Sequence, residues 1–409
     1  MKRTALIAAA ALTIVSAFAK DNKKEKDEDL TGGFVFTDVI TIPDTPVKDQ
    51  NKSGTCWCFA GNGFFEDEIL RNKGQEVDLS EMFVVRQCYL DKAERFVRLY
   101  GQTNFGAGGS AMDVPYVWEH YGALPESAYN GLQYGEDKHS HGELDAALAA
   151  YLNAVVSKPD GRLSTSWRKG VEGILDAYLG PVPETFEVDG ITYTPRSYAD
   201  SLGLDMTDYL PLTSFSHHPF YKAFPVEVPD NWLWAQYYNV PIYELEAIVD
   251  RSLAEGHTVV WAADVSEGGF NWKKGYAVMP KPVDGESLEG TELARWVTLS
   301  DAERRDKRFD ITDGKVDEMD ITQEVRQQMF DRQETTDDHG MVIVGSATDQ
   351  NGNKYYKVKN SWDDNQVYRG YFYVSMPYFR AKTVDILVNR EAIPADIADK
   401  LRAGSAIDK

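Results

Sequence analysis

Helix patterns and strand patterns are segregated along this 409-residue chain, and that order limits the fold class more than any other feature. Apolar residues at helical spacing occur at 56–72, 78–101, 111–121, 143–154, 165–179, 241–255 and 322–333. Strand-type runs occur once early and then late, at 33–42, 257–263, 341–347, 355–359, 371–374 and 386–388. Because helices come first and strands last, the order predicts an α+β fold and not a sheet built from repeated strand–helix–strand units.

The first 19 residues have the pattern of a secretory signal. Lys2 and Arg3 precede an apolar run at 5–16, and Ala17-Phe18-Ala19 forms a cleavage site with small residues at both ends. This pattern predicts an exported protein, periplasmic or secreted, with an uncleaved anchor helix as the alternative. Residues 20–31 are charged and are predicted to be a mobile leader. No later run approaches the roughly 18 apolar residues that a membrane span needs.

The chain is acidic, with 65 Asp and Glu against 43 Lys and Arg and a net charge of −22. A surface that binds nucleic acid needs clustered basic residues, so nucleic acid is excluded as a partner. The same charge is compatible with cationic substrates.

Three cysteines occur, at Cys56, Cys58 and Cys88, and an odd number leaves at least one thiol unpaired. Cys56 follows the turn-forming residues Ser53 and Gly54 and begins the first predicted helix. A helix N-terminus lowers the pKa of a thiol and so favours the reactive thiolate. The alternative for each of the three is a buried structural thiol, which is the common state of free cysteine.

A predicted hairpin carries a histidine and an amide. His339 begins its first strand, Asn351-Gly352 is a turn signal, and the returning strand ends at Asn360. Pairing across this turn brings Asn360 close to His339, where the amide can accept the ring N–H and fix the tautomer, and Trp362 can shield that bond from water. His339 is therefore the candidate general base and acid for Cys56.

Gln50 lies six residues before Cys56. A side-chain amide N–H beside the backbone N–H of Cys56 would form an oxyanion hole for a tetrahedral intermediate. A glutamine that only caps the turn is the alternative.

Gln50, Cys56-Trp57, His339 and Asn360-Ser361-Trp362, in this order, resemble the papain-like cysteine peptidases. Within that family the chain is most similar to the bleomycin hydrolase and aminopeptidase C branch. The supporting segments are Asp78-Leu79-Ser80-Glu81, Gly108-Gly109-Ser110, residues 121–126 and residues 389–394.

The resemblance implies a papain-like fold of two lobes with a large helical insertion. The expected divisions are a helical lobe with the cysteine at 32–129, a helical insertion at 130–255, a β lobe with His339 and Asn360 at 256–402, and a C-terminal tail at 403–409.

The resemblance also implies the chemistry. Cys56 would be the nucleophile, and Gly108 and Gly109 would line the groove and bind the substrate backbone. Peptides are the expected substrates, with no metal and no cofactor. In this branch a C-terminal arm enters the cleft and restricts cleavage to aminopeptidase steps, and the protein is a hexamer. Because residues 403–409 are shorter than that arm, endopeptidase action stays open, as do a silent peptide-binding protein and acyl transfer to another amine.

Two other histidine pairs are weaker candidates. His139 and His141 could be half of a metal site, but a solvated loop is the preferred interpretation. His217 and His218 lie in a proline-flanked loop and are interpreted as structural.

Overall fold

The computed structural model describes residues 30–158, 161–282 and 311–406, and between them residues 290, 294–295, 297–300 and 309. The predicted signal at 1–19, the leader up to residue 29 and the last three residues of the predicted tail lie outside the described residues. None of the described helices is long and apolar enough to cross a membrane.

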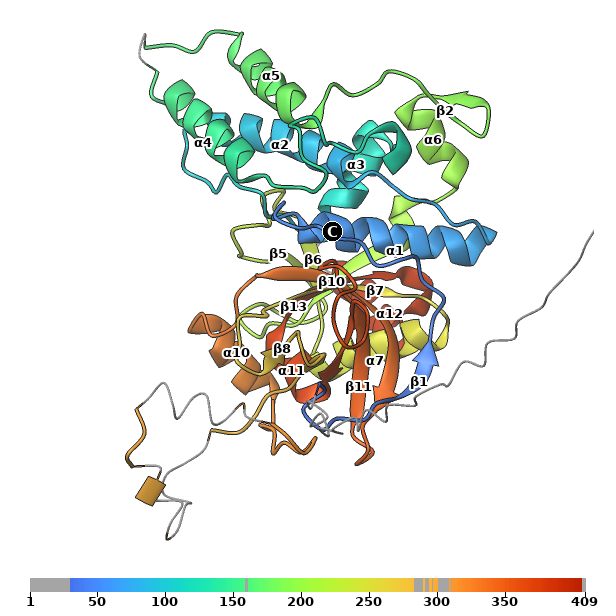
Figure 1. Cartoon of the computed structure of the whole chain (residues 1–409), viewed down its shortest axis with the longest axis vertical. Helices are drawn as coiled ribbons and strands as arrows, with labels where there is room; N and C mark the ends of the chain where they lie inside the picture. Colours follow the sequence, from blue (N-terminus) through green and yellow to red (C-terminus); the bar gives the residue numbers. More distant parts are fainter. Residues whose placement is uncertain are drawn as a thin grey trace, which may run out of the picture.

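The helical lobe lies above the β lobe in Figure 1, with α1 between them. Its helices are α1 (Cys56–Lys73), α2 (Glu81–Arg98), α3 (Asp113–Tyr121), α4 (Gly142–Val156), α5 (Trp167–Leu179) and α6 (Pro195–Leu202). The predicted start of α2 moves by three residues, from 78 to Glu81, because Ser80 caps the helix by accepting a hydrogen bond from the Phe83 N–H. A small hairpin, β2 (Phe186–Val188) and β3 (Ile191–Tyr193), lies beside α6.

The β lobe is built on one mixed sheet in the order β5-β6-β4-β13-β7-β10-β11-β12-β9-β8, with β1 added on β10. Its strands are β1 (Thr37–Thr41), β4 (Tyr209–Thr213), β5 (Ala223–Pro225), β6 (Gln236–Asn239), β7 (Val259–Ala263), β8 (Phe270–Asn271), β9 (Tyr276–Ala277), β10 (His339–Thr348), β11 (Lys354–Lys359), β12 (Tyr371–Ser375) and β13 (Thr383–Asn389). The helices of this lobe are α7 (Ile242–Ala254), α10 (Gln323–Asp331), α11 (Met376–Lys382) and α12 (Ala395–Ala406). The α+β fold class is confirmed.

The predicted helical insertion at 130–255 is wrong between residues 209 and 239, whereas its predicted helix at 241–255 is present as α7. β4, β5 and β6 fall inside it and extend the main sheet beyond β13. Two of these strands have only three or four residues, too few for a clear alternating pattern. The third, β4, contains Pro211 opposite Leu387, and a proline within a run argues against a strand between two neighbours.

Helix α1 is more buried than its pattern predicts, because every residue from Trp57 to Ile69 is buried between the two lobes. Three of these buried residues are acidic: Glu66, Asp67 and Glu68. Two of them contact the β lobe. Asp67 pairs with Lys359 of β11, with 3.3 Å between Nζ and Oδ1. Glu68 lies 2.7 Å from Nδ1 of His257, just before β7. These contacts hold the helix that begins at Cys56 against the strand that ends beside Asn360.

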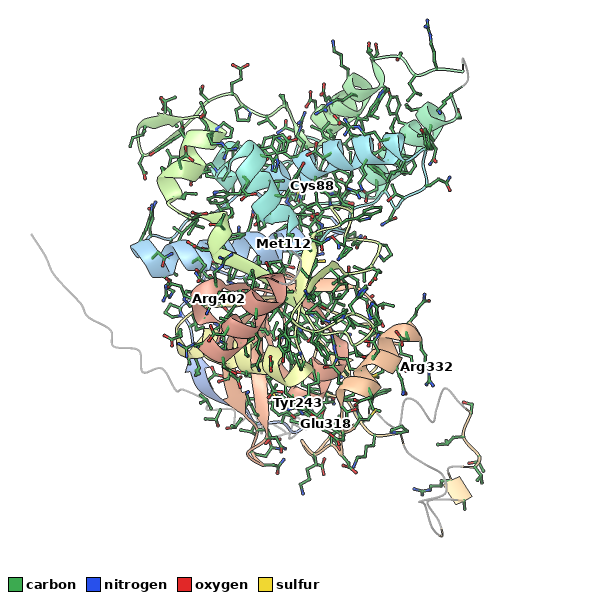
Figure 2. The ribbon with its side chains drawn as sticks, turned by 180° about the vertical axis from the view of Figure 1, so that it is seen from behind. Cys88, Met112, Tyr243, Glu318, Arg332 and Arg402 are labelled. Atoms are coloured by element: carbon green, nitrogen blue, oxygen red, sulfur yellow. The ribbon has the colours of Figure 1, made fainter. Side chains whose placement is uncertain are left out.

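The described residues of α12 do not line the cavity that holds Cys56. Residues 403–406 of the predicted tail belong to α12, which contacts α7 and the segment before β5. Lys400 pairs with Glu244 at 2.6 Å, and Lys222 donates a 2.7 Å hydrogen bond to the Gly404 carbonyl. Arg402 of this helix is labelled on the β lobe in Figure 2.

Candidate active site

Cys56 is the first residue of α1 and is partly exposed. The strand β10 reaches it through Gly340, whose backbone contacts the first turn of α1. A Cβ at Gly340 would lie 3.0 Å from the Trp57 Cα, so only glycine permits this close approach. As a result, Cys56 and His339 line one cavity of about 230 Å³.

The helix N-terminus does not by itself make Cys56 a thiolate. Burial raises the pKa of its thiol to about 11, although backbone N–H groups of Gly340 and Trp57 lower it. The expectation of a lowered thiol pKa is therefore wrong, because loss of solvation outweighs the hydrogen bonds. Burial also lowers the pKa of His339 to about 4, although the hydrogen bond with Asn360 raises it. These pKa values make both groups neutral near pH 7.

His339 is held by the two residues that the hairpin pattern indicated. Its Nε2 donates a 2.7 Å hydrogen bond to Oδ1 of Asn360, which leaves Nδ1 as the basic nitrogen. The Trp362 ring lies over the imidazole, with 4.5 Å between ring centroids. Trp362 is packed in turn against Phe270 and Trp272. The structure thus gives the imidazole one tautomer and a partly water-shielded hydrogen bond.

Gln50 is buried and its amide is oriented by Ser361. The Ser361 hydroxyl donates to Gln50 Oε1 at 2.6 Å, and the Gln50 backbone N–H donates to the Ser361 carbonyl at 2.9 Å. The Nε2 donor of Gln50 is not used by either bond. Gln50 therefore keeps an amide donor outside these two bonds, and an oxyanion donor needs such a group.

Gly108 and Gly109 line the same cavity as Cys56. A Cβ at Gly109 would lie 2.4 Å from Asp113 Oδ2, and one at Gly108 would lie 1.9 Å from Asp230 Oδ2. The Gly108 carbonyl already accepts a hydrogen bond from Lys92, so this carbonyl is not free for a substrate backbone. The roles of Cys56, His339, Asn360, Gln50 and the two glycines stay predictions, now with a common location.

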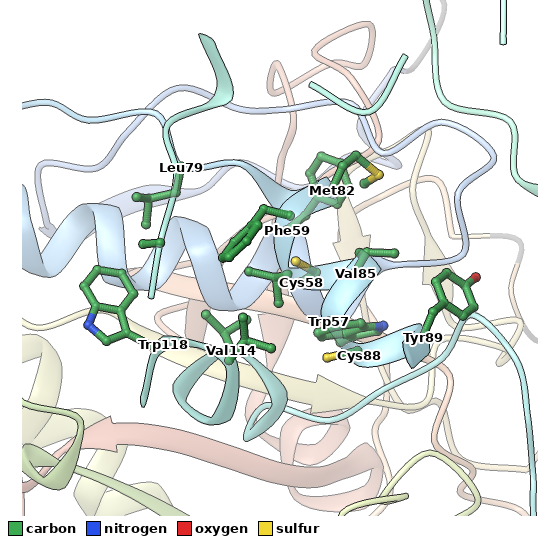
Figure 3. Packing of buried hydrophobic residues seen from close by; sticks show 14 of the residues in the cluster. Trp57, Cys58, Phe59, Leu79, Met82, Val85, Cys88, Tyr89, Val114 and Trp118 are labelled. Atoms are coloured by element: carbon green, nitrogen blue, oxygen red, sulfur yellow. The ribbon is translucent and has the colours of Figure 1, made fainter. Parts of the chain in front are cut away.

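Cys58 and Cys88 are free thiols packed among apolar side chains (Figure 3). Burial raises the pKa of both thiols well above the ordinary value. Cys88 lies inside the helical lobe (Figure 2), and Cys58 Sγ donates to the Glu81 carbonyl at 3.3 Å. Neither cysteine lines the cavity of Cys56.

The cavity holds four carboxylates that the sequence did not single out: Asp230, Asp337, Asp338 and Asp385. Asp337 and Asp338 directly precede His339, and this position beside the candidate histidine is the one sequence signal that could have identified them. Asp230 and Asp385 come from a loop and from β13, and only tertiary packing brings them here.

The two weaker histidine pairs have structural surroundings. His139 and His141 are buried, so the predicted solvated loop is wrong there. His217 and His218 each lie within 3.0 Å of Glu227, a donor set that could hold a metal ion. However, Gln327 Nε2 donates to Nδ1 of His217 at 3.1 Å. The His217 Nε2 therefore carries the proton that binds Glu227, and the cluster is explained by hydrogen bonding.

Comparisons with known proteins agree with this geometry. The model of the papain family cysteine proteases matches residues 40–158, and that of the peptidase C1-like family matches residues 300–407. Aminopeptidase C of Lactobacillus helveticus is 22% identical over 400 residues, which cover 85% of this chain and 80% of the relative. Aminopeptidase G of Lactobacillus delbrueckii subsp. lactis is 24% identical over 399 residues, which cover 87% and 83%.

A solved structure shares the fold. The crystal structure of pepw from Lactobacillus rhamnosis superposes with a TM-score of 0.64 at 19% identity, and covers 90% of this chain and 85% of its own. The matched segments contain Cys56 at one end of the chain and His339 and Asn360 at the other. The chain is therefore similar to the papain-like cysteine peptidases in both matched segments, and to relatives named aminopeptidase C over most of its length.

Proposed function

We propose that this protein is an exported aminopeptidase that removes N-terminal residues from peptides through an acyl-enzyme on Cys56. The observation that carries the peptidase chemistry is the 2.7 Å bond from His339 Nε2 to Asn360, which leaves Nδ1 as the basic nitrogen of a side chain that lines the cavity shared with Cys56. The aminopeptidase assignment is supported by relatives named aminopeptidases that align over most of their length. Export is supported by the signal pattern at residues 1–19.

In the proposed mechanism, Nδ1 of His339 accepts the thiol proton as Sγ of Cys56 attacks the scissile carbonyl carbon. The carbonyl oxygen takes the electron pair, and the Cys56 N–H and Gln50 Nε2 stabilise this negative charge. His339 then gives its proton to the leaving amine, the C–N bond breaks and a thioester remains. Water attacks the thioester by the same path, which releases the acid and restores the thiol.

The test uses one fluorogenic peptide in two forms, with a free and with an N-acetylated terminus. We expect the free form to be cleaved and the acetylated form to be cleaved at least tenfold more slowly. Cys56→Ala should be inactive, and the matched variant Cys58→Ala should keep most activity because Cys58 does not line the cavity. Cleavage by Cys56→Ala would refute the mechanism, and equal cleavage of both forms would refute the aminopeptidase assignment.

Two further parts of the proposal have separate tests. Export predicts that the protein recovered from outside the cytoplasm begins after Ala19, which N-terminal sequencing reads directly. The six-chain assembly that the family resemblance implies predicts a sedimenting mass about six times that of the chain.

A further inference from the structure

The cavity beside Cys56 is lined by more carboxylates than the proposed reaction uses. Asp337 and Asp385 reach it from the segment before β10 and from β13, and Asp230 and Asp338 line it as well. The reaction needs a thiol, an imidazole and oxyanion donors, and these acids serve none of those roles.

Asp385 is the least satisfied of the four. Its side chain is 3% exposed, and its Oδ1 has no hydrogen-bond partner among the described residues. Burial raises the pKa of this carboxyl to about 7, and the charge of Asp113 adds to the rise. A buried carboxylate oxygen that faces a cavity without a donor is costly unless a ligand supplies one.

The cation that acts on the neighbouring acids is used by other groups. Lys92 acts on Asp113 and Asp230, and its Nζ is used by the carbonyls of Gly106 and Gly108. Burial raises the pKa of Asp337 well above its ordinary value, and the charges that add most to this rise belong to other acids: Asp385, Asp230, Asp338 and Asp113. Asp338 differs, because its carboxylate accepts bonds from Thr336 Oγ1 and the Val265 N–H. Asp337 and Asp385 are therefore two carboxyl groups that line the cavity and have no ion pair in the described residues, so a cation that entered the cavity would favour their charged forms.

We propose that Asp337 and Asp385 form a cation subsite that binds the free N-terminal ammonium of the peptide substrate. This rests on the proposed aminopeptidase function and names the residues that would select for it. An ammonium has three N–H donors and one positive charge, which matches two carboxylates with free acceptor capacity. In an N-terminal residue, the ammonium nitrogen is separated from the scissile carbonyl carbon by one Cα. It therefore lies in the same cavity when Cys56 attacks that carbon.

The proposed binding of the ammonium by Asp337 and Asp385 does not require the described part of α12. None of its described residues lines the cavity, so the negative charge that faces the substrate comes from β13 and from the segment before β10. A lysine or arginine side chain one residue further from the cleaved bond offers the same chemistry, and the experiment separates the two sources.

The experiment measures kcat/KM of Asp385→Asn, Asp337→Asn and wild type on three peptide amides. The first is Ala-aminomethylcoumarin with a free terminus, and the others are acetyl-Lys-Ala- and acetyl-Gln-Ala-aminomethylcoumarin. Asp200→Asn, a change of an exposed aspartate in α6, is the matched control. Alkylation of Cys56 by iodoacetamide, together with the thermal midpoint, reports whether each variant is folded with an accessible thiol.

We expect both cavity variants to lose about 10- to 100-fold in kcat/KM on the free-terminus peptide, the range for hydrogen bonds to charged groups. Asp200→Asn should match wild type. A loss confined to the acetyl-Lys peptide would also support the subsite and would assign a basic side chain as its ligand. Folded variants with wild-type kcat/KM on both cationic peptides would overturn the subsite, even where wild type still prefers free termini. Wild type that cleaves none of the three peptides would refute the proposed function, and the subsite with it.

Discussion

Asn360 Oδ1 accepts hydrogen bonds from two donors, the ring Nε2–H of His339 at 2.7 Å and the Ser361 backbone N–H at 2.8 Å. The second bond fixes the amide so that its oxygen faces the imidazole. The orientation of the base is thus determined by the end of β11, the strand that Lys359 ties to Asp67 of α1.

Replacing Asn360 with Ala should lower kcat about 10- to 100-fold and leave KM nearly unchanged. The imidazole would lose the acceptor that fixes its tautomer, and general acid–base catalysis depends on that positioning. Steady-state kinetics on a free-terminus peptide give both constants. An unchanged kcat would show that the Trp362 ring alone holds His339 in place.

Replacing Gln50 with Ala should lower kcat about 100- to 1,000-fold, the range for removing one oxyanion donor. Alkylation of Cys56 by iodoacetamide forms no oxyanion and should keep its wild-type rate. The matched variant Ser361→Ala keeps the amide but removes the hydroxyl that orients it, so we expect a smaller loss, about tenfold. Equal losses in the two variants would mean that Gln50 acts on folding and not on the reaction.

The rate of Cys56 alkylation should fall as the pH drops through about 4. Burial lowers the pKa of His339 to about 4, and only the neutral imidazole can accept the thiol proton. An exposed histidine would place this change near pH 6.5. The rate is measured from pH 3 to 7 with circular dichroism at each point to confirm that the protein is folded. In Asn360→Asp, the added negative charge should move the midpoint to higher pH, and a midpoint near 6.5 in wild type would contradict the buried state.

The free energy of unfolding should rise in Glu126→Gln at alkaline pH. Burial and the neighbouring Glu81 raise the pKa of Glu126 to about 8, and its Oε2 has no hydrogen-bond partner in the described part of the chain. A carboxyl whose folded pKa is raised stabilises the fold below its ordinary value of 4.5, and this contribution is lost as the pH rises through about 8.

The variant carries no charge to bury, so we expect a gain of about 1–3 kcal/mol at pH 8.5 and little change at pH 4.5, measured by urea unfolding. Glu136→Gln, at an exposed position in the same region, is the control and should change neither value. A gain of equal size at both pH values would exclude ionisation as its cause.

The elements that carry the reaction were predictable because their signals are local. A turn before an apolar helix placed Cys56 at a helix start, and the observed α1 begins at that residue. Asn351-Gly352 predicted a hairpin, and the observed register pairs Val342 with Lys359, which brings Asn360 beside His339. Backbone periodicity and turn chemistry determine such neighbours without help from the rest of the chain.

The tertiary structure decided what depends on burial and on distant segments. Short strands such as β5 and β6 exist only because a neighbouring strand supplies their hydrogen bonds, so the predicted helical insertion was wrong there. Desolvation, not the helix N-terminus, determines the pKa of Cys56, and burial follows from packing between lobes. Asp337 and Asp385 are 48 positions apart in the sequence, and only the assembled sheet places both carboxylates in the cavity beside the thiol. The sequence alone therefore determined the candidate reacting groups, while packing in the folded structure decided their pKa values and which carboxyl groups share their cavity.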